Sequence, residues 1–142
     1  MGRMAFGWKR KTARSPEVEA ARQAIEKGWN GLPWGTSLSD FQARFPGATR
    51  SDSGWWLTGD GHESFFGIVM LTQYSFNSRD QLCLVAFYPE TTDRERLPVV
   101  MINALGMPRG QDIGWKLGGV DVDVKAASVA ASLTHRKLAA VR

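Results

Sequence analysis

The sequence is poor in the residues that do most covalent and metal chemistry. Among its 142 residues it has one cysteine and two histidines. A single cysteine excludes a disulfide within the chain. Cys83 lies in the apolar stretch Leu82–Tyr88 without a basic neighbour, which predicts a buried and unreactive thiol. His62 lacks the second histidine that a helical zinc motif places one turn later, and His135 lies far away in the sequence. We therefore predict no metal site.

Motifs for catalysis and for cofactor binding are also missing. The glycines do not follow the spacing of a phosphate-binding loop or of a dinucleotide fingerprint, and G-x-S-x-G does not occur. Asp121 and Asp123 are expected on one face of a strand. A solvent-facing polar strand accounts for them, because the valines between and beside them take the other face. These absences predict a non-enzymatic protein with no cofactor.

Long hydrophobic runs are absent as well. No apolar run approaches the roughly 18 residues of a transmembrane helix, and Met1–Trp8 lacks the apolar core of a signal peptide. Together with the missing disulfides, this predicts a cytoplasmic protein without a transmembrane segment. The hydrophobic share of 43% and the charged share of 23% are typical of a globular protein and exclude disorder over the whole chain.

The positive charge is concentrated at the two ends of the chain. The net charge is +4, but eight of the 18 basic residues lie within 1–14 and 136–142, where there is no acid, and residues 15–135 alone carry −4. This pattern predicts a flexible basic N-terminal arm (1–14), one folded domain (15–135) and a basic C-terminal tail (136–142). Basic ends attract nucleic acid or another anionic surface, and such binding remains an alternative function.

Helix signals occur in three places. Ser15-Pro16-Glu17 combines an N-cap hydroxyl, a first-turn proline and an acid, which predicts a helix over 16–27. Apolar residues at helical spacing predict a second helix over 37–45 and a third that ends near Leu105. The segment between the first two helices, Trp29–Gly35, contains two glycines and a proline and is interpreted as a loop.

Strand signals fill the rest of the chain. The long extended run Ser64–Phe76, the turn 77–80 and the strand Gln81–Tyr88 predict an antiparallel hairpin, and later strands are expected near 115–117, 120–124 and 129–134. The predicted fold is α+β, with two N-terminal helices, a mainly antiparallel meandering sheet of about five to six strands, and one helix inserted between strand groups.

The central strands are apolar on both faces, because Phe65–Leu71 and Leu82–Tyr88 do not alternate between apolar and polar residues. An antiparallel sheet that is covered on one face usually shows that alternation. The second face is therefore expected to be covered by helices, by the N-terminal arm, by a second copy of the chain or by a partner protein.

Two short motifs carry a resemblance to a known group of proteins. Leu32-Pro33-Trp34-Gly35-Thr36-Ser37-Leu38-Ser39-Asp40-Phe41 resembles a helix start in many small bacterial domains, and Leu105-Gly106-Met107-Pro108 before Trp115 resembles their second signature. The group contains the β-lactamase-inhibitor-protein-like domains and the small outer-membrane assembly lipoproteins. The resemblance implies binding of other proteins through sheet and loop surfaces, without a cofactor. The chain lacks the group's secretion signal, lipid-bearing cysteine and disulfides.

These observations together predict a protein-binding module, of the kind found in bacterial inhibitors and immunity proteins. An aromatic sheet face and an adjacent loop are the expected binding surface, with Trp55, Trp56, Tyr74, Tyr88 and Arg109 as its residues. The alternative role for each aromatic residue is in the core, and for Arg109 it is a solvated loop. A homodimer is a further alternative to a partner protein.

Overall fold

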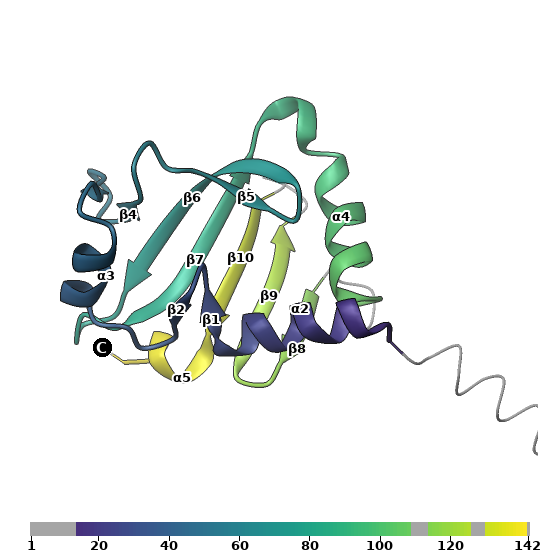
Figure 1. Cartoon of the computed structure of the whole chain (residues 1–142), viewed down its shortest axis with the longest axis horizontal. Helices are drawn as coiled ribbons and strands as arrows, with labels where there is room; N and C mark the ends of the chain where they lie inside the picture. Colours follow the sequence, from purple (N-terminus) through teal and green to yellow (C-terminus); the bar gives the residue numbers. More distant parts are fainter. Residues whose placement is uncertain (1–13, 109–113, 126–129, 142) are drawn as a thin grey trace, which may run out of the picture.

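A computed structural model describes residues 14–108, 114–125 and 130–141 of the chain. The described residues form an α+β domain in which helices pack against an antiparallel sheet (Figure 1). The helices are α2 (Pro16–Lys27), α3 (Leu38–Arg44), α4 (Arg96–Leu105) and α5 (Arg136–Ala139), with a 3-10 turn at Thr91–Asp93. None of these helices is both long and apolar enough to span a membrane.

The strands are short except for the central pair. They are β1 (Gly28–Trp29), β2 (Leu32–Pro33), β3 (Thr49–Arg50), β4 (Trp56–Leu57), β5 (His62–Phe65), β6 (Ile68–Phe76), β7 (Leu82–Pro89), β8 (Gly114–Leu117), β9 (Val120–Lys125) and β10 (Ala130–His135). The main sheet has the order β3-β4-β6-β7-β10-β9-β8, with β5 also paired to β6, while β1 and β2 pair only with each other.

The predicted meander of five to six strands is wrong. Over the described ranges the main sheet has eight strands, and a fourth helix, α5, follows the last strand. After β7, the chain passes through α4 to the far edge of the sheet, and β8, β9 and β10 then return toward the centre, so β10 pairs with β7. Two-residue strands such as β3 are too short to show a hydrophobic period in the sequence.

The long extended run expected over Ser64–Phe76 is two strands. A tight turn at Phe66 and Gly67, with φ values of 48° and 90°, separates β5 from β6. This turn reverses the chain, and it places Phe65 opposite Ile68 rather than on the face of Val69. From Ile68 onward, buried side chains alternate with more exposed ones up to Tyr74, so the alternation that seemed absent is present.

The predicted loop after the first helix contains a small hairpin. α2 starts as expected, with Ser15 Oγ accepting a hydrogen bond from the backbone N–H of Val18. It runs directly into β1, and the turn Asn30-Gly31 then leads into β2, with φ values of 53° and 73°. Two consecutive positive φ values are the signature of a type I′ turn, and Asn-Gly is the preferred pair for it.

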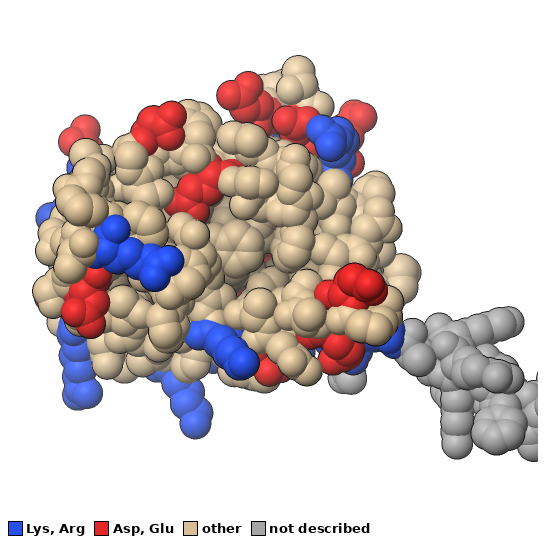
Figure 2. Space-filling view, viewed as in Figure 1, with Lys and Arg blue, Asp and Glu red and all other residues tan. Residues whose placement is uncertain are grey.

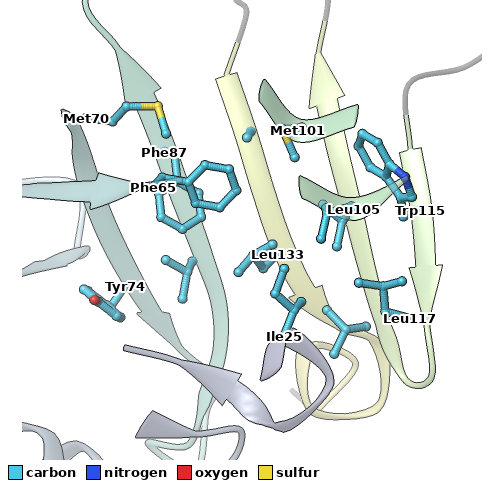
Figure 3. Close-up of a cluster of buried hydrophobic side chains, with 14 of the residues drawn as sticks. Ile25, Phe65, Met70, Tyr74, Phe87, Met101, Leu105, Trp115, Leu117 and Leu133 are labelled. Carbon is cyan, nitrogen blue, oxygen red and sulfur yellow. The ribbon is translucent and has the colours of Figure 1, made fainter. Parts of the chain in front are cut away.

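One face of the main sheet, here called the inner face, carries the core. α2, α3 and α4 and the β1–β2 hairpin all place buried side chains in one cluster with this face, among them Phe41 of α3. Ile25 of α2 and Met101 of α4 belong to the same cluster (Figure 3). Phe65 and Phe87 lie next to each other in the middle of the cluster, and Leu133 on β10 extends it toward α2 (Figure 3).

The opposite face, here called the outer face, contributes little to this cluster. Strand register places Val69, Leu71 and Tyr88 on it, and Val69 is 55% and Tyr88 40% exposed. On β9, Asp121 lies on the same face and pairs with Arg136. The outer face is therefore apolar over β6 and β7 and charged toward β9.

The segment expected to be a tail begins with α5. Its Leu138 is half-buried, and the carbonyl of that residue accepts a hydrogen bond of 3.0 Å from Asn77 Nδ2 in the turn before β7. His135 caps the helix through Nδ1, which accepts from the N–H of Leu138. Residues 136–141 are thus joined to the domain.

Gly28 is the position at which the β1–β2 hairpin tolerates no side chain. A Cβ there would lie 1.9 Å from the backbone oxygen of Leu32 and 2.8 Å from the Cα of Pro33. Because these are backbone atoms of the paired strand, Gly28→Ala must open the hairpin. We expect it to lower the free energy of unfolding by about 2 kcal/mol, measured by urea denaturation.

Gly47→Ala is the matched control, because a Cβ at Gly47 meets no atom within 4 Å. This variant should unfold close to the wild-type midpoint. Equal midpoints for the two alanine variants would contradict the close approach of β1 and β2 at Gly28.

Candidate functional site

A pocket of about 670 Å³ opens where α2 passes into the β1–β2 hairpin. Its lining is contributed by the end of the helix and by the whole hairpin: Ala24, Lys27, Gly28, Trp29, Asn30, Gly31, Leu32 and Pro33. Figure 2 shows a hollow near the centre of this side of the molecule, bordered mainly by uncharged residues. The pocket therefore lies against the inner face of the sheet and not on the outer face.

Trp29 connects the pocket to a group of four rings, here called the aromatic cluster: Trp29, Phe65, Phe66 and Phe87. The centroid of the Trp29 ring lies 5.2 Å from that of Phe65 and 5.1 Å from that of Phe87. Phe66, at the β5–β6 turn, lies 6.2 Å from Trp29 and 4.7 Å from Phe65. The hairpin is thus attached to the sheet through ring contacts of tilted and edge-to-face geometry, which aromatic pairs prefer.

The indole N–H of Trp29 is buried and has no hydrogen-bond partner among the described residues. Two other tryptophans behave differently. Trp34 Nε1 donates to the carbonyl of Ile25 at 2.8 Å, and Trp115 Nε1 donates to the carbonyl of Gly106 at 2.9 Å. Buried tryptophans usually find such a partner, since an unmet buried donor costs free energy. The donor of Trp29 is therefore the unusual feature of the pocket wall.

The ring of Phe66 belongs to the aromatic cluster, and the backbone of this residue is strained. Its φ of 48° lies in the left-handed region, which asparagine and glycine tolerate and a bulky aromatic residue rarely adopts. Asn30 and Asp80 are the other described non-glycine residues with positive φ. Backbone strain of this kind persists where surrounding contacts enforce it, and it is common at binding sites.

A second group, here called the polar cluster, fixes the tip of the hairpin: Asn30, Thr58, Glu63 and Tyr74. Tyr74 donates its hydroxyl proton to Glu63 Oε1 at 2.7 Å, and Asn30 Nδ2 donates to the same oxygen at 3.3 Å. Thr58 donates to the other carboxylate oxygen. Asn30 lines the pocket, so these bonds hold one pocket wall against β5 and β6.

Burial strongly raises the pKa of Tyr74, and the neighbouring negative charge of Glu63 raises it further. The phenol therefore stays neutral and acts as a hydrogen-bond donor to Glu63. Glu63 in turn accepts from three side chains, which leaves it in a structural role. Within the described ranges, no group of three His, Cys, Asp or Glu side chains is arranged to hold a metal ion.

The structure separates the residues that the sequence suggested as one binding surface. Tyr74 is fully buried on the inner face, and Trp56 pairs with it there. The ring centroid of Trp56 lies 6.2 Å from that of Phe41 on α3. Tyr88 lies on the outer face. Trp55 is half-buried just before β4, and Arg109 lies outside the described residues. Among the described residues, Tyr88 therefore lies on the opposite face of the sheet from Tyr74 and Trp56.

The pocket residues were missed in the sequence for an identifiable reason. Trp29–Gly35 was interpreted as a loop, although Asn30-Gly31 is the strongest short signal for a hairpin. That signal would have predicted a turn with Trp29 beside it. It would not have predicted the unmet indole donor, which depends on rings contributed by β5 and β7.

Comparisons with known proteins add nothing to this description. No protein-family model matches the chain, and neither the curated proteins nor the solved structures contain a match. The resemblance to small bacterial protein-binding domains stays a prediction.

Replacing Tyr74 by phenylalanine tests the polar cluster. We expect Tyr74→Phe to lower the free energy of unfolding by about 1 kcal/mol at neutral pH, because Glu63 loses a buried donor. The pH dependence should change as well. In the wild type the unfolded chain loses the phenolic proton near its ordinary pKa of 10.0, whereas the folded chain keeps it. This contribution to stability is complete below pH 10 and is lost as the pH rises above it.

The measurement is denaturant unfolding at neutral pH and at several values around pH 10. The stability difference between the wild type and Tyr74→Phe should shrink above pH 10, whereas Tyr88→Phe, which alters the exposed tyrosine, serves as the control. A constant difference across this range would show that Tyr74 ionises in the folded protein as it does in the unfolded chain.

Proposed function

We propose that the protein is a binding domain for a small, mainly apolar molecule that occupies the pocket between α2, the β1–β2 hairpin and the inner face of the sheet. The observation that carries the proposal is the unpartnered, buried indole donor of Trp29, a residue that lines a pocket of about 670 Å³. Pockets of roughly 300–1,000 Å³ with mostly apolar walls and few polar groups are the usual form of small-molecule sites.

The walls are held in place in a way that suits binding. The Asn30 side chain ties the hairpin tip to Glu63 and Tyr74, and Trp34 ties the chain after the hairpin to the last turn of α2. A wall that is already ordered loses little conformational entropy when a ligand enters. The pocket is thus supported by contacts that do not depend on the ligand.

Binding without catalysis fits the same residues. The Glu63 carboxylate accepts hydrogen bonds from three neighbours, and the phenol of Tyr74 keeps its proton. A general acid or base needs a free position toward the reacting group and a pKa near the working pH. Glu63 lacks the free position, and the pKa of Tyr74 is raised far above the working pH, which supports a non-enzymatic role.

The proposal is tested by filling the pocket from α2. Ala24 lines the pocket, so Ala24→Phe should place a ring in the space of the ligand. The neutral fluorophore prodan serves as the probe, because its emission changes when it enters an apolar site. We expect Ala24→Phe to weaken prodan binding at least about tenfold, a loss that corresponds to roughly 1.4 kcal/mol.

Ala20→Phe is the matched control. Ala20 is exposed on the preceding turn of the same helix and is not part of the pocket lining. Its affinity for prodan should equal that of the wild type. Equal affinities for the wild type and for both variants would mean that prodan binds elsewhere, and absence of binding to the wild type would remove the proposal.

A second candidate function is protein recognition through the outer face. The supporting observation is the exposure of Val69 and Tyr88, at 55% and 40%, on a face to which α2, α3 and α4 contribute no buried side chain. Exposed apolar side chains that adjoin one another often mark interaction sites. The partner tested first is a second copy of the chain. Nucleic-acid binding through the basic ends has less support, because Arg136 is paired with Asp121.

Self-association is measured by native mass spectrometry of the purified protein. We expect a homodimer for the wild type and a monomer for Val69→Lys, because the lysine places a charge in the apolar contact. Lys substitution at Gln42, an exposed position on α3, should leave the dimer intact. A wild-type monomer at micromolar concentration would exclude self-association as the use of this face.

A further inference from the structure

We infer that the ligand of the pocket is a neutral, mainly apolar molecule with one hydrogen-bond acceptor, and that this acceptor accepts a hydrogen bond from the indole N–H of Trp29. The inference rests on the proposed function and specifies its ligand class. It is carried by three observations: the unmet donor of Trp29, the rings that surround it, and the charges at the pocket.

The indole N–H of Trp29 determines which kind of ligand atom can form a hydrogen bond with it. An indole N–H donates and cannot accept, so the atom that satisfies it must be an acceptor such as a carbonyl oxygen. The faces of neighbouring phenylalanine rings are weak acceptors at best. Phe87 lies nearly perpendicular to Trp29, at 78°, and its ring face is at most an acceptor of this weak kind. An oxygen of a bound molecule would be the stronger partner.

The position of the indole sets a condition on binding. Solvent does not reach Nε1, although Trp29 as a whole is half-buried and lines the pocket. The indole must therefore turn about its side-chain bonds when the acceptor arrives. Binding should consequently change the environment of Trp29 Nε1 directly.

The charges around the pocket favour a neutral molecule. An aromatic cluster often binds quaternary ammonium groups, but Lys27 lines this pocket and repels a cation. The nearest carboxylate of the polar cluster, Glu63, is already engaged by Tyr74, Asn30 and Thr58. Lys27 attracts an anion to the pocket, but Lys27 is exposed, and the one buried N–H donor of Trp29 cannot replace the hydration of a carboxylate that reaches the indole.

Three probes with the same ring system separate these possibilities. Naphthalene has no acceptor, methyl naphthyl ketone adds a neutral carbonyl, and naphthyltrimethylammonium adds a cation. Binding to the full chain is followed in ¹H–¹⁵N NMR spectra, in which the six tryptophans give six indole resonances. The resonance that is missing in Trp29→Phe identifies Nε1–H of Trp29.

We expect the ketone to bind about threefold to tenfold more tightly than naphthalene, the gain of one net hydrogen bond. The Trp29 Nε1–H resonance should move downfield with the ketone and not with naphthalene. In Trp29→Phe, the two probes should bind with equal affinity. Trp115→Phe is the control, because it removes an indole donor that the carbonyl of Gly106 already satisfies, and it should keep the preference for the ketone.

The outcomes distinguish the inference from the function on which it rests. If no probe binds, the proposed small-molecule function fails. If naphthalene and the ketone bind equally and the Trp29 resonance does not move, the pocket binds ligands but the acceptor inference is wrong. Tightest binding of the ammonium probe would overturn the inference in favour of a cation site. If Trp29→Phe folds poorly, the inference is still decided by whether the ketone binds more tightly than naphthalene and moves one of the six indole resonances downfield, with both effects retained in Trp115→Phe.

Discussion

The pocket depends on the packing of Trp29 against the rings of Phe65 and Phe87. A two-stranded hairpin of two residues per strand is not stable by itself, so β1 and β2 need a contact with the rest of the molecule. Trp29 supplies that contact, and α2 runs directly into β1. The same ring contact therefore positions the helix end, the hairpin and the space between them. The bonds from Asn30 to Glu63 and Tyr74 then fix the hairpin tip.

The two faces of the sheet have different physical roles. The inner face buries nearly all of its large side chains beneath α2, α3, α4 and the hairpin, and the pocket lies where α2 meets the hairpin in this cover. The outer face keeps Val69 and Tyr88 exposed beside a charged region that includes Asp121. A ligand in the pocket and a protein on the outer face would occupy opposite sides of the sheet. The two candidate functions are therefore compatible in space.

Local signals in the sequence predicted the elements that are governed by neighbouring residues. The cap at Ser15 marked the start of α2, and the alternation around Asp121 and Asp123 marked β9, whose polar residues share one face. The prediction of one long strand was wrong at a turn whose first residue is atypical for a turn. Phe66-Gly67 is a turn with an aromatic residue in a left-handed conformation, which residue preferences disfavour, so the run from Ser64 was interpreted as one strand.

The sequence alone determined the class of the molecule: a helix-and-sheet domain with basic ends, few reactive side chains and strongly apolar central strands. These properties depend on composition and on patterns over a few residues. Only the tertiary structure decided that Tyr74 and Trp56 face inward, that Tyr88 faces outward, and that the indole of Trp29 has no partner. Each of these facts depends on which distant strands pair. The two-residue turn at Phe66-Gly67, for example, reverses the chain and so decides which face of the sheet each following side chain of β6 takes.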